Sequence, residues 1–481
     1  MVNDILNKIK KLPSPVMVSF CYMFCSVLQK CISLITVPIL TRILTPAQYG
    51  QISVYSSWEN IVAIVAALNL ASNVYIKGLV KYESDRKSFT SSLQVLSFCS
   101  TIIVFIIVMF NIDFFVNFFG MPKLWIILLF IEVFFGEAQK FWLAWKRVEN
   151  NWKTMLYITV SYTILNPFIT LIAVTFAPTN IKGNVKIISS LFVLIIFAIP
   201  IIFTFFHKNN NKIRLYYIID SLKISIPLVP HYLSQLVLDQ FDRIMINKYC
   251  GSYETGIYSV TYNISQIMKI VINSINSTFI PWLYQSLSKK KYSRIKKLTN
   301  YLIIIVFLCI FLFILLAPEL IKVILPSKYY EAIYLVAPIS MSLFYIFIYT
   351  LFTNIELYFD RTYLTTIATL LTAVLNVFLN QKYIHVFGYQ AAAYTTMACY
   401  IILMIMHYIN YKNVLKKNHI NISLLNIKLI CSLLLFSFFI VIIYNFLIEK
   451  IYIRIIIMLF ITFFIYWVLR LKRLNIKTGE N

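Results

Sequence analysis

The stretch that decides the fold is PLVPHYLSQLVLDQFDRIMINKYCG, which runs from Pro227 to Gly251. Most of it reads as a membrane-spanning helix, yet it contains Asp239, Asp242 and Arg243. An ionisable side chain at bilayer depth costs about 3 kcal/mol or more unless it is paired or hydrated. Chains keep such groups where they line a polar cavity or lock two helices together. The stretch therefore indicates transport rather than catalysis on a soluble substrate.

The composition of the whole chain is that of a membrane protein. Its 481 residues are 60% hydrophobic and 13% charged, and the mean hydropathy is +0.79. At about 20 residues per span, this length holds many helices and little else. The net charge of +25 indicates Lys and Arg that orient the chain in the membrane. We expect no nucleic-acid partner, because no basic soluble domain exists to bind one.

The chain lacks the patterns of enzymes, metal sites and disulfide frameworks. Its eight Cys have no CxxC pair and mostly lie in apolar runs, where they act as small hydrophobic residues. There is no HExxH motif and no phosphate-binding loop, and nine Gly are too few for a glycine-built nucleotide site. The start, MVNDILNKIKKLPSP, enters the first span directly and predicts no cleavable signal. We expect a non-enzyme without cofactor or metal, apart from a coupling Na⁺ or H⁺.

The hydrophobic pattern predicts an all-α membrane protein of about 14 transmembrane helices. The expected spans are 15–40, 52–72, 90–111, 124–144, 154–177, 187–206, 224–247, 256–282, 299–317, 333–357, 364–384, 389–410, 424–446 and 453–470. With the N-terminus inside, about 30 Lys and Arg lie inside and about 10 outside. Both termini are therefore expected to be cytoplasmic.

A faint internal repeat predicts two lobes. GQISVYS begins at Gly50 and GIYSVTY begins at Gly256, with Ser-Val at the same offset and 206 residues between the glycines (256 − 50). The interval covers six spans, so both copies have one orientation, as expected for lobes related by an axis along the membrane normal. We predict an N-terminal six-helix lobe (1–206), a C-terminal six-helix lobe (207–411) and two additional helices with a basic tail (412–481).

Seven ionisable residues are expected within the membrane: Lys30, Glu59, Glu132, Asp239, Asp242, Arg243 and Lys269. They either pair between helices to hold the bundle together or line a hydrophilic central cavity. Lys30 and Glu59 lie at depths where they can pair. Lys269 has no acid nearby in the sequence, so it is expected to face water or an anionic substrate.

A second set of polar residues suits a cation. Asp239 and Asp242 share a helix face, and Arg243 is four residues from Asp239 and can pair with it. Asn376 and Asn380 share a face of a later span, and the next span contains Thr395 and Thr396. Oxygen atoms that converge from three helices suit a hard monovalent cation or a proton relay. The alternative for the two Asn is hydrogen bonding between helices.

Prolines and glycines mark local features. Pro227 and Pro230 either bend the seventh span or end a helix. Thr45 and Pro46 resemble a helix N-cap followed by Pro at the first helical position. Gly50 is expected to allow a turn in the first outer loop.

Three motifs resemble bacterial polysaccharide flippases. PLVPHYLSQLVLDQFDRIMINKYCG with GIYSVTYNI (Gly256–Ile264) resembles their second-half signature, and PILTRILTPAQYG (Pro38–Gly50) their first-loop signature. NVFLNQKYIHVFGYQAAAYTT (Asn376–Thr396) resembles their span eleven to twelve pattern, although a second Gly is absent where Tyr389 or Gln390 stands. The chain is thus similar to Wzx-type O-antigen and capsule repeat-unit flippases of the multidrug/oligosaccharidyl-lipid/polysaccharide exporter superfamily.

The resemblance implies a V-shaped cavity between two six-helix lobes that opens alternately to each side. It implies a bacterial inner-membrane protein that moves undecaprenyl-pyrophosphate-linked oligosaccharide to the outer leaflet. Partners would be this lipid-linked oligosaccharide, membrane lipids, and a polysaccharide polymerase with its chain-length regulator. By resemblance a sodium site would use Asp239 or Asp242, with Asn376, Asn380 and Thr395 or Thr396.

The expected substrate cavity combines charge with hydrogen-bonding groups. Cationic groups would replace water around a pyrophosphate, and amides would bind sugars. The candidate cavity residues are Lys30, Glu59, Arg243, Lys269 and Asn273. Two alternatives stay open: a drug/cation antiporter of the same superfamily, which favours an acidic cavity, and a membrane-embedded polysaccharide polymerase, which needs larger outer loops.

Overall fold

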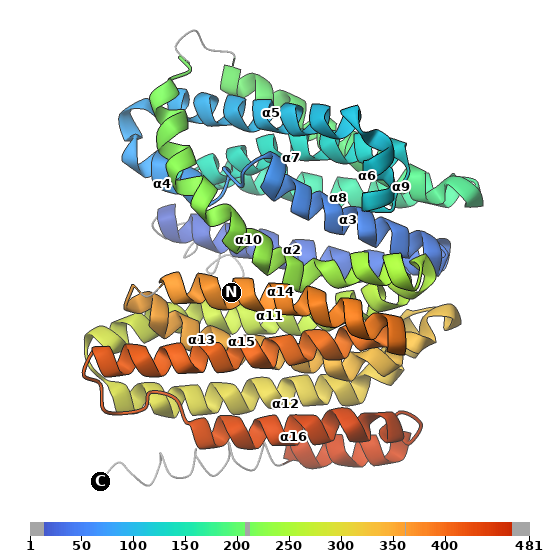
Figure 1. Cartoon of the computed structure of the whole chain (residues 1–481), viewed down its shortest axis with the longest axis vertical. Coiled ribbons are helices and arrows are strands. Elements are labelled where there is room, and N and C mark those ends of the chain that lie inside the picture. Colours follow the sequence, from blue (N-terminus) through green and yellow to red (C-terminus); the bar gives the residue numbers. More distant parts are fainter. Residues whose placement is uncertain (1–13, 207–211, 361, 464–481) are drawn as a thin grey trace, which may run out of the picture. The chain divides into compact units, whose positions relative to one another are not determined.

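The computed structural model describes residues 14–206, 212–360 and 362–463, and these residues form helices without a strand. Figure 1 shows the helices in chain order from blue to red. The α-helices are α2 (Ser14–Ile43), α3 (Pro46–Ala66), α4 (Asn73–Lys81), α5 (Arg86–Phe110), α6 (Ile112–Phe119), α7 (Lys123–Val148), α8 (Trp152–Phe176), α9 (Lys182–Phe206), α10 (Leu215–Tyr249), α11 (Ser252–Ser288), α12 (Tyr292–Ile324), α13 (Val336–Tyr358), α14 (Thr362–Phe387), α15 (Gln390–Lys417) and α16 (Ile427–Leu447). Three short 3-10 helices are η1 (Glu83–Asp85), η2 (Thr179–Ile181) and η3 (Ser327–Leu335).

The all-α membrane architecture is confirmed. Within the described residues, nine helices are long and apolar enough to span a membrane, or ten if the bent pair α6–α7 is one span. The long helices α3, α10 and α11 lie at three predicted spans but are not among these nine. Polar residues lower the hydropathy of these helices, and several of them, among them Glu59, Asp242 and Arg243, belong to the clusters described below. The total of fourteen spans stays a prediction.

Two compact units make up the chain. The first contains Met1–Ser259 and Ala373–Tyr389, and the second contains Val260–Thr372 and Gln390–Asn481. Both α11 and α14 therefore contribute residues to each unit. These units do not follow the lobe boundaries predicted from the repeat, and the division into lobes 1–206, 207–411 and 412–481 stays a prediction.

Two glycines bring α3 and the start of α11 into backbone contact within the first unit. A Cβ added at Gly50 would lie 1.9 Å from the carbonyl oxygen of Ser252, and one at Gly256 would lie 2.1 Å from that of Pro46. The contact is reciprocal, because each glycine meets the residue four positions before the other. The same 206-residue offset relates both pairs (252 − 46 and 256 − 50). Two copies of a motif related by a two-fold axis make contacts of this kind.

The first-loop signature is helical from Pro46 onward. Thr45 caps α3: its side chain accepts a hydrogen bond from the backbone N–H of Gln48, whose side chain accepts one from the N–H of Thr45. The predicted N-cap with Pro at the first position is therefore confirmed. The predicted turn at Gly50 is wrong, because Gly50 lies inside α3 and serves close packing instead.

Helix α10 continues through both Pro227 and Pro230, so these prolines do not end it. Each proline lacks an N–H and leaves a carbonyl one turn earlier without its helical donor. Gly388 and Tyr389 join α14 to α15, and Gly388 has a φ of +71°. One left-handed glycine is sufficient here, and the missing second glycine of the family pattern does not prevent the turn.

We predict that Gly50→Ala destabilises the protein by about 1–3 kcal/mol, because the added methyl group meets backbone that cannot move without separating two helices. The control is Gly136→Ala in α7, where an added Cβ meets nothing within 4 Å. Thermal unfolding of the purified protein in detergent measures both. Equal melting temperatures for the two variants would contradict the role given to Gly50.

Candidate functional site

The centre of the candidate site is Asp242 on α10. Its side chain is 2% exposed. One carboxylate oxygen, Oδ1, accepts a hydrogen bond of 2.7 Å from Nδ2 of Asn380 on α14, and Oδ2 accepts one of 2.5 Å from the hydroxyl of Tyr258 on α11. Asn380 Nδ2 also donates to Oδ1 of Asn376 over 3.2 Å. Three helices of the first unit thus converge on one buried carboxylate.

This cluster joins three of the predicted cation-site residues: Asp242, Asn376 and Asn380. Both Asn side chains are fully buried, and the four-residue spacing puts them on one face of α14. Asp239 lies one turn before Asp242 and is only partly buried. Tyr258, which sequence reasoning missed, binds the carboxylate from the second repeat motif. Of the two aspartates that the sequence left open, Asp242 is the more buried.

Thr395 and Thr396 are buried on α15 and belong to the second unit. The Thr395 hydroxyl donates to the backbone carbonyls of Ala391 and Ala392, one turn earlier in its own helix. Its predicted role as a cation ligand stays a prediction.

Arg243 lies beside Asp242 and is 6% exposed. Its guanidinium donates to the backbone carbonyl of Asp239 and to the side-chain oxygen of Gln240. That oxygen also accepts a hydrogen bond of 3.3 Å from Ser57 on α3. Helices α3 and α10 pack against each other, and the bond from Ser57 to Gln240 helps to hold the Arg243 guanidinium in place.

A second polar cluster in the first unit surrounds Glu59 and Glu132. The hydroxyl of Tyr55 donates to Glu132 Oε2 over 2.7 Å, and Lys140 Nζ pairs with Glu137 Oε1 over 2.8 Å. The charge of Glu59 interacts with those of Glu132, Lys140, Glu137 and Lys186. Three carboxylates and two ammonium groups from α3, α7 and α9 thus share one region of an otherwise apolar unit.

The predicted pair of Lys30 and Glu59 does not form. Lys30 is exposed on α2 and makes no ion pair with any residue in the described ranges. The cations near Glu59 are Lys140 and Lys186 instead. Sequence reasoning missed both because they lie close to the ends of their predicted spans, where lysine is ordinarily an interfacial residue.

The remaining predicted cavity residues lie on α11 in the second unit. Lys269 is partly buried and Asn273 is exposed. Within the first unit, Arg243 lies beside the cluster of Asp242, Asn376 and Asn380. Glu59 belongs to the second polar cluster, and Lys30 belongs to neither. Assembly of all five predicted cavity residues around a substrate stays a prediction.

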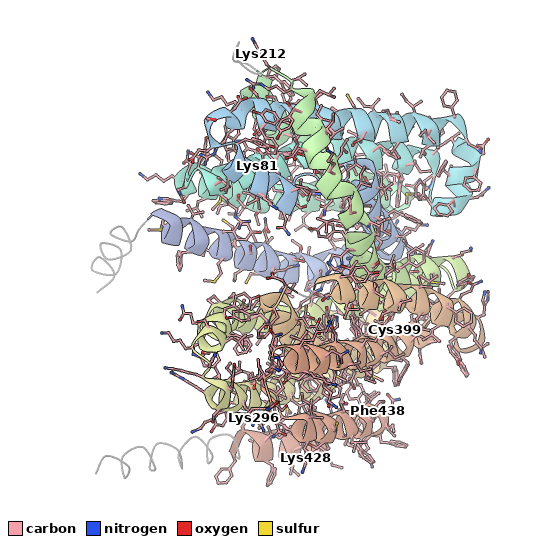
Figure 2. The ribbon with its side chains drawn as sticks, turned by 60° about the vertical axis from the view of Figure 1, so that its left-hand side comes forward. Lys81, Lys212, Lys296, Cys399, Lys428 and Phe438 are labelled. Atoms are coloured by element: carbon pink, nitrogen blue, oxygen red, sulfur yellow. The ribbon has the colours of Figure 1, made fainter. Side chains whose placement is uncertain are left out.

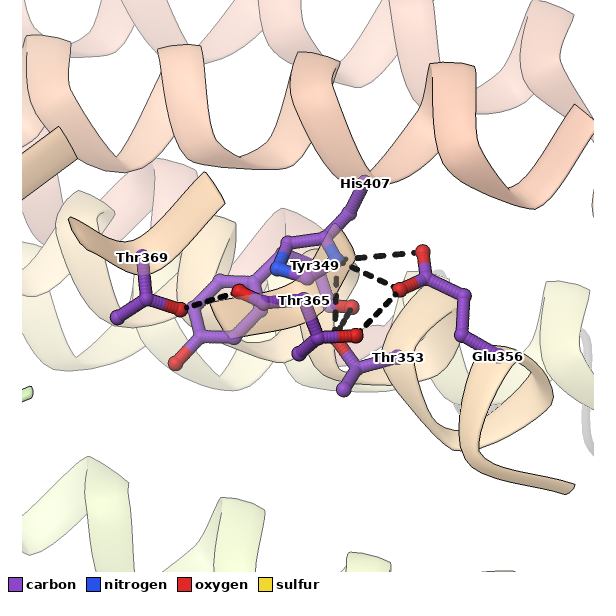
Figure 3. A network of polar contacts seen from close by, with 6 residues as sticks. All are labelled: Tyr349, Thr353, Glu356, Thr365, Thr369 and His407. Carbon is purple, nitrogen blue, oxygen red and sulfur yellow. Dashed lines mark hydrogen bonds and ion pairs between the residues drawn. The ribbon is translucent and has the colours of Figure 1, made fainter. Parts of the chain in front are cut away.

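The second unit contains a buried pair that sequence reasoning missed (Figure 3). Glu356 on α13 is fully buried, and its two oxygens lie 3.2 and 3.0 Å from Nδ1 of His407 on α15. Thr365 donates to Glu356 Oε2 over 3.0 Å, and the Tyr349 ring stacks on the imidazole. Glu356 and His407 lie near the ends of predicted spans, where a polar residue is ordinary, so the hydropathy pattern did not identify them as candidates.

Outside the predicted spans, Asp220 ties the start of α10 to α4. Lys81 Nζ donates to Asp220 Oδ2 over 2.8 Å, and the hydroxyl of Tyr82 donates to the same oxygen over 2.6 Å. These bonds hold the pKa of Asp220 below its usual range, so the carboxylate stays ionised at neutral pH.

Comparison with known families decides the classification. A family model described as polysaccharide biosynthesis protein matches residues 19–287, more than half of the chain. The chain belongs to this family. A second model, MatE, matches residues 227–381, a range that contains the whole Asp242 cluster.

Solved structures share the fold at low sequence identity. The lipid II flippase MurJ in an inward closed conformation has a TM-score of 0.68 at 14% identity, covering 95% of this chain and 100% of that one. An inward-facing multidrug resistance MATE family transporter of the MOP superfamily has a TM-score of 0.60 at 12% identity, covering 80% and 96%. Lsg locus putative protein 1 of Haemophilus influenzae is 30% identical over 83 residues, which are 17% of this chain and 20% of that protein.

The aligned segment therefore spans about a fifth of the curated relative. The fold neighbours are named as a membrane transporter and a flippase, not as enzymes. The chain is accordingly a multi-pass membrane protein of the polysaccharide biosynthesis family, and it shares its fold with these transporters.

We predict that His407→Leu destabilises the protein by about 3–5 kcal/mol, because it leaves the Glu356 carboxylate buried without its partner. Glu356→Gln is the matched variant: its amide oxygen still accepts from His407, so it costs less. Thermal unfolding in detergent compares the two. A smaller loss for His407→Leu than for Glu356→Gln would argue against the pairing.

Proposed function

We propose that this protein is a flippase that moves undecaprenyl-pyrophosphate-linked oligosaccharide repeat units from the cytoplasmic to the outer leaflet of the bacterial inner membrane. The observation that carries the proposal is the group of buried polar residues around Asp242 and Arg243 in a chain of the polysaccharide biosynthesis family. A buried charge in a membrane protein by default indicates a functional site. On this proposal both termini are cytoplasmic.

On this proposal, Arg243 and Lys269 bind the pyrophosphate of the substrate. A pyrophosphate that leaves water needs donors that replace its hydration, and a guanidinium does so through several N–H groups at once. Arg243 donates to Gln240, which Ser57 also contacts, and a guanidinium has a planar fork of five N–H donors that matches the geometry of a phosphate. Lys269 on α11 would supply a second positive charge. Amide side chains such as Asn273, which is exposed on α11, would bind the sugars.

We predict that Arg243→Ala lowers transport at least ten-fold, since about 1.4 kcal/mol of lost interaction with the pyrophosphate gives this factor. Lys269→Ala should act in the same direction. The measurement is complementation of a flippase-deficient strain by variants whose amounts in the membrane match the wild type. Full complementation by both variants would refute the cationic cavity.

A cation is proposed to drive the cycle, with Asp242 as its charged ligand. Asn380 now donates through Nδ2 to Asp242 and to Asn376. A 180° rotation of the Asn380 amide would exchange its oxygen and nitrogen, so that the oxygen faces Asp242 while the backbone stays in place. Asp242, Asn376 and Asn380 would then offer three oxygen atoms to one ion, the ligand type that Na⁺ requires. The carboxylate supplies the single negative charge that balances it.

We predict that replacing Na⁺ by K⁺ lowers flipping in wild-type proteoliposomes and that Asp242→Asn removes this difference. The control is Asp239→Asn, which removes the same charge one helical turn away and should keep the Na⁺ dependence. The rate of lipid flipping under each ion gradient is the readout. Transport that is unchanged with either cation and under an imposed proton gradient would eliminate ion coupling.

A drug/cation antiporter is the second candidate, and the cluster around Glu59 favours it. Its three carboxylates exceed its two ammonium groups, and an acidic region attracts a cationic drug. The two candidates differ in one observable: an antiporter confers resistance to cationic drugs and does not restore polysaccharide export in the flippase-deficient strain.

A further inference from the structure

A basic cavity lies in the second unit, and none of the candidate site residues described above lines it. It has a volume of about 860 Å³. Its wall is formed by Lys296 near the start of α12, the last turns of α15, the segment 418–426 and the first turn of α16. Figure 2 labels Lys296 and Lys428, which reach it from α12 and α16.

The wall of the cavity has a defined shape because one tyrosine holds the connecting segment. The hydroxyl of Tyr411, on the buried side of α15, accepts hydrogen bonds from the backbone N–H groups of Leu424 and Leu425, over 2.9 and 3.2 Å. Asn426 then caps α16 by accepting from the N–H of Leu429. The cavity is thus built by a fixed loop between two helices.

Its charge is entirely positive. Four lysines line it, and no Asp or Glu does: Lys296, Lys412, Lys416 and Lys428. None of the four forms an ion pair with a carboxylate in the described part of the chain. Lys428 is the second residue of α16, where the helix dipole is also positive and disfavours a cation. Four like charges around one cavity repel one another unless an anion binds between them.

The rim of the same cavity is apolar. Ile409 and Ile422 both line it, and they are 55% and 52% exposed. The segment 418–426 joins two helices that are each long and apolar enough to span the membrane, so the cavity lies where these spans leave the bilayer. Positive charge beside exposed apolar side chains at a membrane surface matches a ligand with a phosphate and an acyl chain.

We propose that this cavity binds the phosphate headgroup of an anionic phospholipid, with the acyl chains passing Ile409 and Ile422 into the bilayer. The ammonium groups of Lys412, Lys416 and Lys428 contact the phosphate oxygens, and Lys296 closes the cavity from α12. Asn413, Asn421 and Asn426 offer neutral hydrogen-bonding groups for the rest of the headgroup. The cavity shares no residue with the Asp242 cluster, and the proposal does not depend on the transported substrate.

The test uses the purified full chain in detergent, with bound lipid counted by native mass spectrometry during titration with phosphatidylglycerol. Phosphatidylcholine serves as the neutral lipid and sodium pyrophosphate as the soluble anion. The cavity variant combines Lys412→Gln, Lys416→Gln and Lys428→Gln. The matched control combines Lys289→Gln, Lys291→Gln and Lys297→Gln, which removes the same charge from the same unit at lysines that do not line the cavity.

Each lysine near an anionic headgroup contributes about five-fold in affinity, so the cavity variant should lose phosphatidylglycerol binding at least ten-fold. The control variant should stay within about three-fold of the wild type, and phosphatidylcholine binding should not change. If the triple variant does not fold, Lys428→Gln alone should lower phosphatidylglycerol binding by about five-fold.

Three results would overturn the proposal. Equal losses in the cavity and control variants would mean that surface charge alone retains the lipid. Phosphatidylcholine bound as tightly as phosphatidylglycerol would exclude recognition of an anion. Pyrophosphate binding that the cavity variant loses, with phosphatidylglycerol binding unchanged, would assign the cavity to a soluble anion.

Discussion

The backbone contact between Gly50 and Gly256 is the constraint on which the first unit depends. It brings α3 against the start of α11 more closely than any side chain allows. Two residues after Gly256, Tyr258 reaches the Asp242 carboxylate, and seven residues after Gly50, Ser57 reaches Gln240 and thereby Arg243. Asp242 and Arg243 of α10 are thus contacted, directly or through Gln240, by side chains that the glycine contact places. The repeat motif contributes to the site as well as to the fold.

Buried polar groups explain why α3, α10 and α11 are less apolar than the other long helices. A membrane helix gains stability from apolar surface, and every buried charge reduces that gain unless a partner offsets it. Asp242 has Asn380 and Tyr258, Glu132 has Tyr55, and Glu356 has His407 and Thr365. Each partner comes from another helix, so the same hydrogen bonds that satisfy the charges also fix how the helices pack.

Much of the fold followed from the sequence because hydropathy and short motifs act locally. The all-α class, the cap at Thr45 and the shared face of Asn376 and Asn380 depend on spacing within a few residues. The partners of Glu59 and the pair of Glu356 and His407 depend on which helices meet, and no local pattern encodes that. Gly50 illustrates the difference: the sequence predicted a turn there, and only the packing partner shows that this glycine serves a close approach instead.

The central claim is that this chain moves a lipid-linked oligosaccharide across the membrane. The most direct measurement uses the purified protein in liposomes with undecaprenyl-pyrophosphate-linked oligosaccharide on the inner leaflet only, and follows the sugar's exposure to an added external glycan-modifying enzyme. The account predicts faster exposure than in protein-free liposomes, with little exposure when Arg243→Ala replaces the wild type. Equal exposure with and without the wild-type protein would contradict it.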